Sequence, residues 1–187
     1  MAYINTIQPE QAEGQLKEIY DGLLKSRGKI AEVHKIQSLN PQSIINHMEL
    51  YMTIMFGKSP LKRYRREMMA VIVSVNNQCK YCTVHHGEAL NHFWKDAPKL
   101  QRLIDNYHEA GLDDVDTAWC AYAEVMTNTP HAVNRQYYEN TLRQLGISDR
   151  EILDAALVIA YFNFVNRLVL GLGVELEPDH GKGYKYD

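Results

Sequence analysis

Apolar residues recur at intervals of three and four along much of the chain, which is the period of an amphipathic helix. One such stretch lies between Pro9 and Gly28, with apolar positions at Leu16, Ile19, Tyr20, Leu23 and Leu24. Another lies between Pro41 and Gly57. Proline suits the first turn of a helix and glycine its C-terminal end. Since glycine and proline are sparse and gather at such boundaries, the pattern favours helices over many tight turns.

The same periodicity and its end signals predict further helices along the chain. They are expected at 31–39, in about ten residues before Gly111, at 118–127 after a cap at Asp116 or Thr117, and from Pro130 or Asn134 to Gly146. A last long helix opens at Ser148, because Ser148 and Glu151 have the spacing of a capping box.

The stretch 67–90 is predicted to form two helices joined by a turn. The run 68–75 is mostly apolar, and it is too long and too rich in methionine for a strand. It ends at the Asn-Asn-Gln sequence of 76–78, which favours a turn and a helix N-cap. The second helix then begins near Cys79 and continues at least to Leu90.

If these two helices fold back on each other, they bring four reactive side chains together. At 1.5 Å per residue, Glu67 lies roughly 15 Å before the turn and His86 roughly 13 Å after it. Cys82 and His86 are one turn apart and Cys79 is two turns from His86, so all three share one helix face. The spacing therefore predicts an acid–base pair beside a dithiol.

Composition restricts the class of protein. With 187 residues, 45% hydrophobic and 23% charged, the chain is expected to be a soluble single domain, 1–187. A net charge of −3 gives no electrostatic reason for a nucleic acid or an anionic membrane as partner. Three cysteines and no apparent signal peptide indicate a reducing cytoplasm, where a CxxC is redox-active or binds metal. The apolar run 152–161 is too short to span a membrane.

The order of Glu67, eleven residues, the Cys79–Cys82 pair, three residues and His86 resembles the alkylhydroperoxidase D-like branch of the carboxymuconolactone decarboxylase superfamily. Within that branch the chain is similar to the uncharacterised peroxidase-related proteins, also before Pro41 and over 163–174. The resemblance implies an all-α fold of about eight helices around a 61–90 hairpin. It also implies a homo-oligomer, either a trimer or a hexamer.

The activity that this resemblance implies is that of a thiol-dependent hydroperoxide reductase. Cys82 would attack the hydroperoxide and become a sulfenic acid, on which Cys79 closes a disulfide. His86 would be the base, oriented by Glu67. The helix dipole alone would favour Cys79 as nucleophile, because Cys79 lies nearer the helix start. We follow the resemblance, because His86 lies one turn from Cys82.

The cycle implies partners but no bound cofactor. The substrate would be an organic hydroperoxide, and an external dithiol must reopen the disulfide, either a small dithiol or a thiol protein. In the well-studied branch of the family that protein is a lipoylated carrier. The chain departs from that branch at Tyr81, where the family has a histidine, and tyrosine is a poor base at neutral pH. His85 points about 100° away from His86, and we interpret it as a surface or subunit-facing residue.

Two other functions stay open. The superfamily name suggests a decarboxylase or isomerase acting on a carboxylated lactone, although that chemistry needs a proton donor rather than a dithiol. The other alternative is a non-catalytic helical oligomer or metal-binding module. Cys79, Cys82 and His86 could supply three zinc ligands, but the sequence holds no second CxxC to complete the set.

Other residues have plainer interpretations. Cys120 is expected in the core, and Glu67 is expected to pair with Arg63. The Met and Tyr stripe of the helix after Pro41 favours core over pocket, and the basic run 62–66 favours a solvated face. The tail 177–187 is expected to be mobile or to cover a neighbouring subunit. The histidines that receive no role are His34, His47, His92, His108, His131 and His180.

A weak internal similarity relates two parts of the chain. A shift of 84 positions aligns 61–90 with 145–174 and places Asn163 on Cys79 and Asn166 on Cys82. We interpret this as a repeat of two helical hairpins, of which only the first keeps its thiols.

Overall fold

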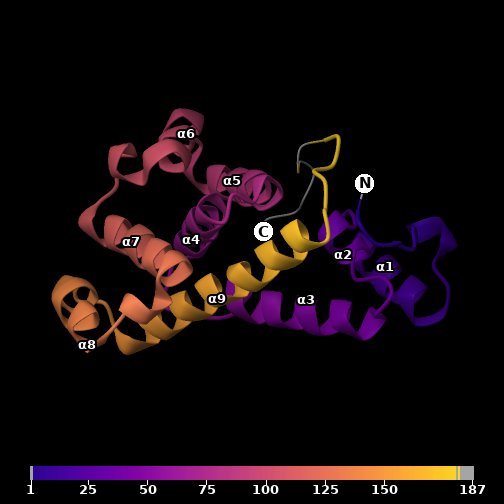
Figure 1. The fold of residues 1–187 in the computed structure, drawn as a ribbon, viewed down its shortest axis with the longest axis horizontal. Helices are drawn as coiled ribbons and strands as arrows, with labels where there is room; N and C mark the ends of the chain where they lie inside the picture. Colours follow the sequence, from indigo (N-terminus) through magenta and orange to yellow (C-terminus); the bar gives the residue numbers. More distant parts are fainter. Residues whose placement is uncertain (1, 180, 182–187) are drawn as a thin grey trace.

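The chain folds into helices joined by short connections (Figure 1). The computed structural model describes residues 2–179 and 181, and no strand occurs among them. The α-helices are α1 (Gly14–Arg27), α2 (Glu32–Lys35), α3 (Pro41–Phe56), α4 (Arg63–Asn76), α5 (Lys80–Trp94), α6 (Ala97–Asn106), α7 (Asp114–Asn128), α8 (Arg135–Tyr137) and α9 (Asp149–Gly171). The all-α prediction is confirmed.

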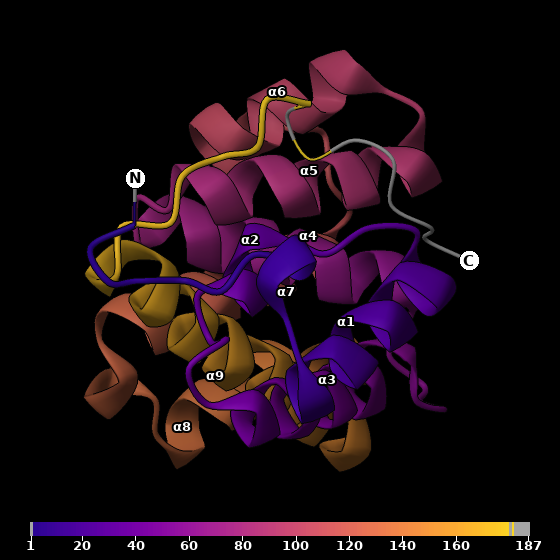
Figure 2. The same cartoon turned by 90° about the vertical axis from the view of Figure 1, so that its right-hand side faces the viewer.

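Helix α4 lies at the centre of the fold and packs against α5, α7 and α9 (Figures 1 and 2). Every residue from 66 to 74 is buried, as expected for a helix enclosed by others rather than an amphipathic surface helix. Helices α1 and α3 pack together around a separate small apolar cluster. Because α3 also packs on α9 and α4, this N-terminal unit lies beside the main core.

Arg66 corrects the prediction that the basic run 62–66 is a solvated face. Its side chain is buried, and its guanidinium donates to main-chain oxygens at the end of α3 and just after it; these belong to Ile54, Met55, Gly57 and Leu61. Carbonyl groups at a helix C-terminus lack partners within the helix, so a buried guanidinium can satisfy several at once. Arg66 therefore ties the end of α3 to α4.

Most helix ends lie where the sequence signals place them. Gly28 adopts a left-handed φ of 84° at the end of α1, and Ser148 forms the predicted capping box with Glu151. Helix α7 begins earlier than expected, because the Asp113 side chain accepts a hydrogen bond from the Asp116 main chain and caps the helix there.

Two predicted helices are shorter or less regular than expected. The helix over 31–39 is reduced to α2, followed by turns. The region before Gly146 combines α8 with short 3₁₀ and π segments; these are Pro130–Ala132, Tyr138–Leu142 and Arg143–Leu145. Further 3₁₀ turns occur at Pro9–Gln11 and Tyr107–Glu109.

Helix α9 is one uninterrupted helix of 23 residues. The second half of the proposed repeat is therefore not a hairpin, and Asn163 and Asn166 lie within a helix whereas Cys79 lies at a turn. By length and composition α9 could also cross a membrane, because the whole helix is longer than the apolar run 152–161 within it. It packs against α3, α4 and α7 and buries eight of its residues, as a core helix does.

Candidate active site

The turn between α4 and α5 places both cysteines at the start of α5. Cys79 is the N-cap residue, and Cys82 follows in the first turn. The side chain of Asn77 donates to Asn163 and Asn166 on α9, at 3.0 and 3.2 Å. The position of the turn is therefore held by hydrogen bonds to a helix distant in sequence.

The two cysteine sulfurs lie 2.6 Å apart and are joined by a thiol–thiol hydrogen bond. Both are free thiols and both are buried, with exposed fractions of 0% for Cys79 and 2% for Cys82. This hydrogen bond lowers the pKa of Cys79, whereas the bond and burial raise the pKa of Cys82. Of the two, Cys82 lines a pocket. A molecule in that pocket reaches the Cys82 sulfur first.

Glu67 on α4 and His86 on α5 meet across the two helices. The buried Glu67 carboxylate accepts a hydrogen bond from His86 Nδ1 at 2.7 Å and another from Arg63. Burial raises the pKa of Glu67, but His86 and Arg63 outweigh this and leave it below its usual value. With Nδ1 bound to a carboxylate, His86 keeps Nε2 for the pocket that it lines. The predicted ion pair with Arg63 is therefore present together with the contact to His86.

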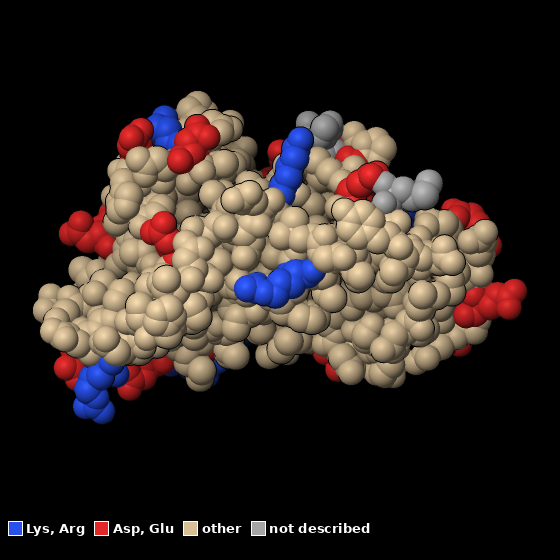
Figure 3. Space-filling model, viewed as in Figure 1, with Lys and Arg blue, Asp and Glu red and all other residues tan. Residues whose placement is uncertain are grey.

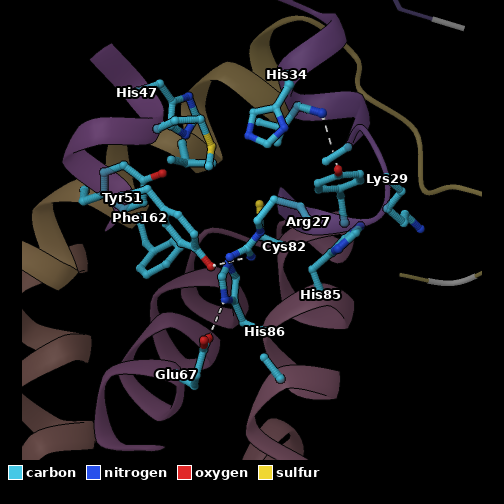
Figure 4. A pocket seen from close by; sticks show the side chains of 17 residues that line it. Arg27, Lys29, His34, His47, Tyr51, Glu67, Cys82, His85, His86 and Phe162 are labelled. Atoms are coloured by element: carbon cyan, nitrogen blue, oxygen red, sulfur yellow. Dashed lines mark hydrogen bonds and ion pairs between the residues drawn. The ribbon is translucent and has the colours of Figure 1, made fainter. Parts of the chain in front are cut away.

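A pocket of about 90 Å³ lies over Cys82 (Figure 4). We call its residues from α4 and α5 the floor; these are Glu67, Tyr81, Cys82, His85, His86 and Ala89. We call its residues from the N-terminal unit the roof, which includes Arg27, Lys29, Val33, His34, His47 and Tyr51. Tyr161, Phe162 and Val165 of α9 complete the lining as a wall.

The roof contains two histidines to which the sequence assigned no role. Burial lowers the pKa of His34 to about 3 and that of His47 to about 4, so both rings are neutral near pH 7. His47 Nδ1 is hydrogen-bonded to Gln37 at 2.8 Å. His34 Nδ1 is buried and has no hydrogen-bond partner within the described residues. No local motif contains these histidines, and only the tertiary contacts reveal them.

The apolar stripe of α3 serves both the core and the pocket. Met48 and Tyr51 line the pocket, Met55 is fully buried in the core, and Met52 is 42% exposed. The interpretation as plain core is therefore wrong for Met48 and Tyr51. This stripe was the one sequence signal that pointed to the roof.

Glu177 connects the C-terminal segment to α5. Its carboxylate accepts from the Tyr81 hydroxyl at 3.0 Å and from the Glu32 main-chain N–H at 3.1 Å, and pairs with His85 Nε2 at 2.8 Å. Burial raises the pKa of Glu177, but His85 and the main-chain N–H groups of Glu32 and Glu177 lower it to about 2. The carboxylate is thus held ionised against the floor.

Two predictions fail at this network. His85 is not a surface residue, because it lines the pocket and pairs with Glu177. Glu177 is not part of a mobile tail, because it is only 8% exposed and is bound to its own chain. Residues 180 and 182–187 of the predicted tail lie outside the described residues. The carboxylate that His85 meets is distant in sequence, so helical spacing alone could not reveal this contact.

Cys120 packs in the main core and is not among the residues that line the pocket. Cys120 is fully buried, and burial raises the pKa of its thiol, so its prediction as a core residue is confirmed. Over residues 2–179 and 181, no group of three His, Cys, Asp or Glu side chains is placed to hold a metal ion.

Solved structures share this fold over nearly the whole chain. One is the alkylhydroperoxidase AhpD core of an uncharacterised peroxidase-related protein from Ralstonia eutropha JMP134, with a TM-score of 0.87, 22% identity and 98% of both chains covered. Another is an uncharacterised peroxidase-related protein from Silicibacter sp. TM1040, with a TM-score of 0.83, 26% identity, and 99% of this chain and 93% of that chain covered. The chain has the alkylhydroperoxidase D-like fold.

The same fold also occurs in the debrominase Bmp8, which matches with a TM-score of 0.76 and 18% identity over 94% of this chain and 92% of that chain. A cysteine-to-alanine variant of Bmp8, in complex with 2,3,4-tribromopyrrole, matches with a TM-score of 0.78. No protein-family model and no curated protein sequence matches the chain. The predicted resemblance to the alkylhydroperoxidase D-like superfamily is confirmed, and the fold is compatible with more than one activity.

Proposed function

We propose that this chain is a thiol-dependent hydroperoxide reductase that works through the Cys79–Cys82 dithiol. The observation that carries the proposal is the pair of free sulfurs 2.6 Å apart, one of which lines a pocket shared with the His86–Glu67 pair. Sulfurs in contact can form a disulfide with little movement, and a buried imidazole–carboxylate pair can move the protons.

The reaction balances as two steps. His86 takes the proton of Cys82, the thiolate attacks the outer peroxide oxygen, and the O–O bond breaks. The departing alkoxide receives that proton and leaves as an alcohol, while Cys82 becomes a sulfenic acid. The Cys79 sulfur then attacks the Cys82 sulfur and water leaves, so one peroxide is reduced and two thiols are oxidised to a disulfide.

Access decides which cysteine acts as the nucleophile in this proposal. The position of Cys79 at the helix N-cap and the lowered pKa of its thiol favour Cys79 on electrostatic grounds. Cys79 is fully buried and does not line the pocket, however, so a peroxide cannot reach it without passing Cys82. We therefore assign Cys82 as nucleophile and Cys79 as resolving thiol.

The disulfide must be reopened by an external dithiol, since the proposed cycle uses no bound cofactor. An attacking thiolate meets the same access limit as the peroxide, because Cys82 is the sulfur on the pocket side. We therefore propose that the reductant is a small dithiol, or a protein that carries a dithiol at the end of a narrow, extended side chain. A lipoylated carrier protein has that shape.

Counting free thiols tests the proposal. The reduced protein is mixed with cumene hydroperoxide, and we expect the loss of two thiols per chain, restored by dithiothreitol. Cys82→Ser should abolish the loss, while Cys79→Ser should consume peroxide once and accumulate a sulfenic acid that dimedone traps. The matched control is Cys120→Ser, since Cys120 lies in the core away from the pocket. Unchanged thiols in the wild-type chain would exclude the reductase.

A second candidate function is reductive removal of bromine from a small aromatic ring, which the similarity to the debrominase Bmp8 and its complex with 2,3,4-tribromopyrrole favour. In that reaction a carbon–bromine bond is replaced by a carbon–hydrogen bond, bromide leaves, and the two thiols become a disulfide. Bromide release from 2,3,4-tribromopyrrole, with oxidation of Cys79 and Cys82, would support it. Thiol loss with peroxide and no bromide release would favour the reductase.

We also propose that the chain forms a homo-oligomer. Helix α9 carries four large apolar side chains that are at least 43% exposed; these are Leu153, Leu157, Phe164 and Leu170. Three of them, Leu153, Leu157 and Phe164, lie on one face of α9 by helical spacing, and we propose that a second copy of the chain covers this face. Light scattering coupled to gel filtration would give the number of subunits.

A further inference from the structure

The roof of the pocket holds a guanidinium that pairs with no carboxylate among the described residues. Arg27 donates to the Tyr51 hydroxyl at a long 3.5 Å, and it lies 5.4 and 5.3 Å from the ring centres of Tyr51 and Phe56. The Glu67 carboxylate, which also lines the pocket, is already bound by Arg63 and His86. A partly buried cation without a counter-charge is unfavourable, and a bound anion would remove this cost.

Neutral hydrogen-bonding groups lie around this guanidinium. The buried Nδ1 of His34 has no hydrogen-bond partner within the described part of the chain, although His34 lines the pocket. Tyr161 also lines the pocket; burial raises the pKa of its hydroxyl, as do Tyr51 and Cys82 nearby, whereas Arg27 lowers it. Figure 4 shows His34 above Cys82, and the Arg27 side chain reaching past Cys82 to the Tyr51 hydroxyl, beside His86.

We propose that Arg27, His34 Nδ1 and the hydroxyls of Tyr51 and Tyr161 form an anion-binding subsite in the pocket beside Cys82, and that the substrate is a small hydroperoxide bearing a carboxylate. A guanidinium presents paired N–H groups that match the two oxygens of a carboxylate. The volume of about 90 Å³ limits the ligand to a small acid. The carboxylate binds the roof while the peroxide group faces the sulfur on the floor. The peroxide part of this assignment rests on the proposed function, whereas the subsite does not.

Two alkylating reagents of nearly equal size test the subsite without peroxide. Iodoacetate carries a carboxylate and iodoacetamide a neutral amide; each forms a sulfur–carbon bond with a thiolate and releases iodide. The rates are measured at Cys82 by mass spectrometry in a Cys79→Ser background. Because both reagents attack the same thiolate, the ratio of their rates cancels any change in the thiolate fraction.

We expect Arg27→Gln to lower the ratio of the iodoacetate to the iodoacetamide rate about tenfold, the effect of losing one charge-assisted hydrogen bond. Arg27→Lys should keep part of the preference. The matched control is Lys25→Gln, which removes a positive charge from the same last turn of α1 but outside the pocket. A ratio that is unchanged in Arg27→Gln, or that falls equally in Lys25→Gln, would overturn the subsite.

A second experiment uses only the wild-type chain, so it does not depend on whether a variant folds. It measures how well small ligands protect Cys82 from alkylation. Propanoate at millimolar concentration should slow the alkylation of wild-type Cys82 by iodoacetamide more than propanamide does, with ionic strength matched by chloride. Equal protection would overturn the subsite. Charge-dependent alkylation without any reaction with hydroperoxides would refute the proposed function alone, and peroxide reduction with an unchanged ratio would refute the subsite alone.

Discussion

The floor and the roof of the pocket differ in how their side chains are satisfied. On the floor, reactive groups are paired with each other or with close neighbours: Cys82 touches Cys79, and His86 is bound to Glu67. On the roof, His34 has an unpartnered ring nitrogen within the described residues, and Arg27 has one long hydrogen bond. We infer that the floor is organised for proton and thiol chemistry, whereas the roof is organised to select what binds there.

The largest expected effect concerns the floor. His86→Ala should slow peroxide-dependent thiol oxidation about a thousandfold, because the proposed base is lost while the sulfurs stay in place. Stopped-flow thiol kinetics measure this effect. His92→Ala, an exposed histidine on the same helix, is the control and should leave the rate unchanged. Unaltered kinetics in His86→Ala would remove His86 from the mechanism.

Glu67→Gln should destabilise the fold by about 3 kcal/mol, since it leaves the charge of Arg63 in a mostly buried place without its partner. Urea unfolding measures this loss. Arg135→Gln serves as control because the Arg135–Glu139 pair is exposed, and its loss should cost less than about 1 kcal/mol. Equal losses of stability in the two variants would mean that the buried Arg63–Glu67 pair contributes no more than an exposed pair.

The roof should dominate the response to mild acid. His34 and His47 have pKa values of about 3 and about 4 in the fold, below the ordinary 6.5, so the unfolded chain binds more protons below pH 6.5. The free energy of unfolding should therefore fall as the pH decreases from 6.5 to 5, by up to about 1.4 kcal/mol per pH unit for each histidine.

Replacing both roof histidines checks this pH dependence. The double variant His34→Gln and His47→Gln should flatten the fall in the free energy of unfolding between pH 6.5 and pH 5, as measured by urea unfolding. His108→Gln, at an exposed position, should not flatten it. A slope that survives the double replacement would show that other groups carry the acid sensitivity.

The smallest effect on stability is expected at the hydrogen bond between Tyr81 of the floor and Glu177 of the C-terminal segment. Tyr81→Phe removes the hydrogen bond to Glu177 and should cost about 1 kcal/mol of stability. Because the Tyr81 hydroxyl already donates to Glu177, the rate of thiol oxidation should change little. A large fall in that rate at nearly unchanged stability would instead indicate that Tyr81 acts on the peroxide.

The amino-acid sequence by itself brought together three residues of the floor, Glu67, Cys82 and His86, with Cys79, which does not line the pocket. Glu67, Cys79, Cys82 and His86 lie within one short segment, where helical geometry converts spacing directly into proximity, and their order carries the family resemblance. Most helix ends could likewise be predicted from the sequence, because capping depends on residues within a few positions of each other.

Only the tertiary structure decided the roof and the C-terminal contact. Arg27, His34 and Glu177 reach the pocket from segments far from α5 in sequence, and α9 turned out to be one helix rather than a second hairpin. Such contacts depend on how whole helices pack, which no local pattern specifies. Local spacing therefore places the reactive groups of the floor, whereas packing between distant parts of the chain places the side chains of the roof.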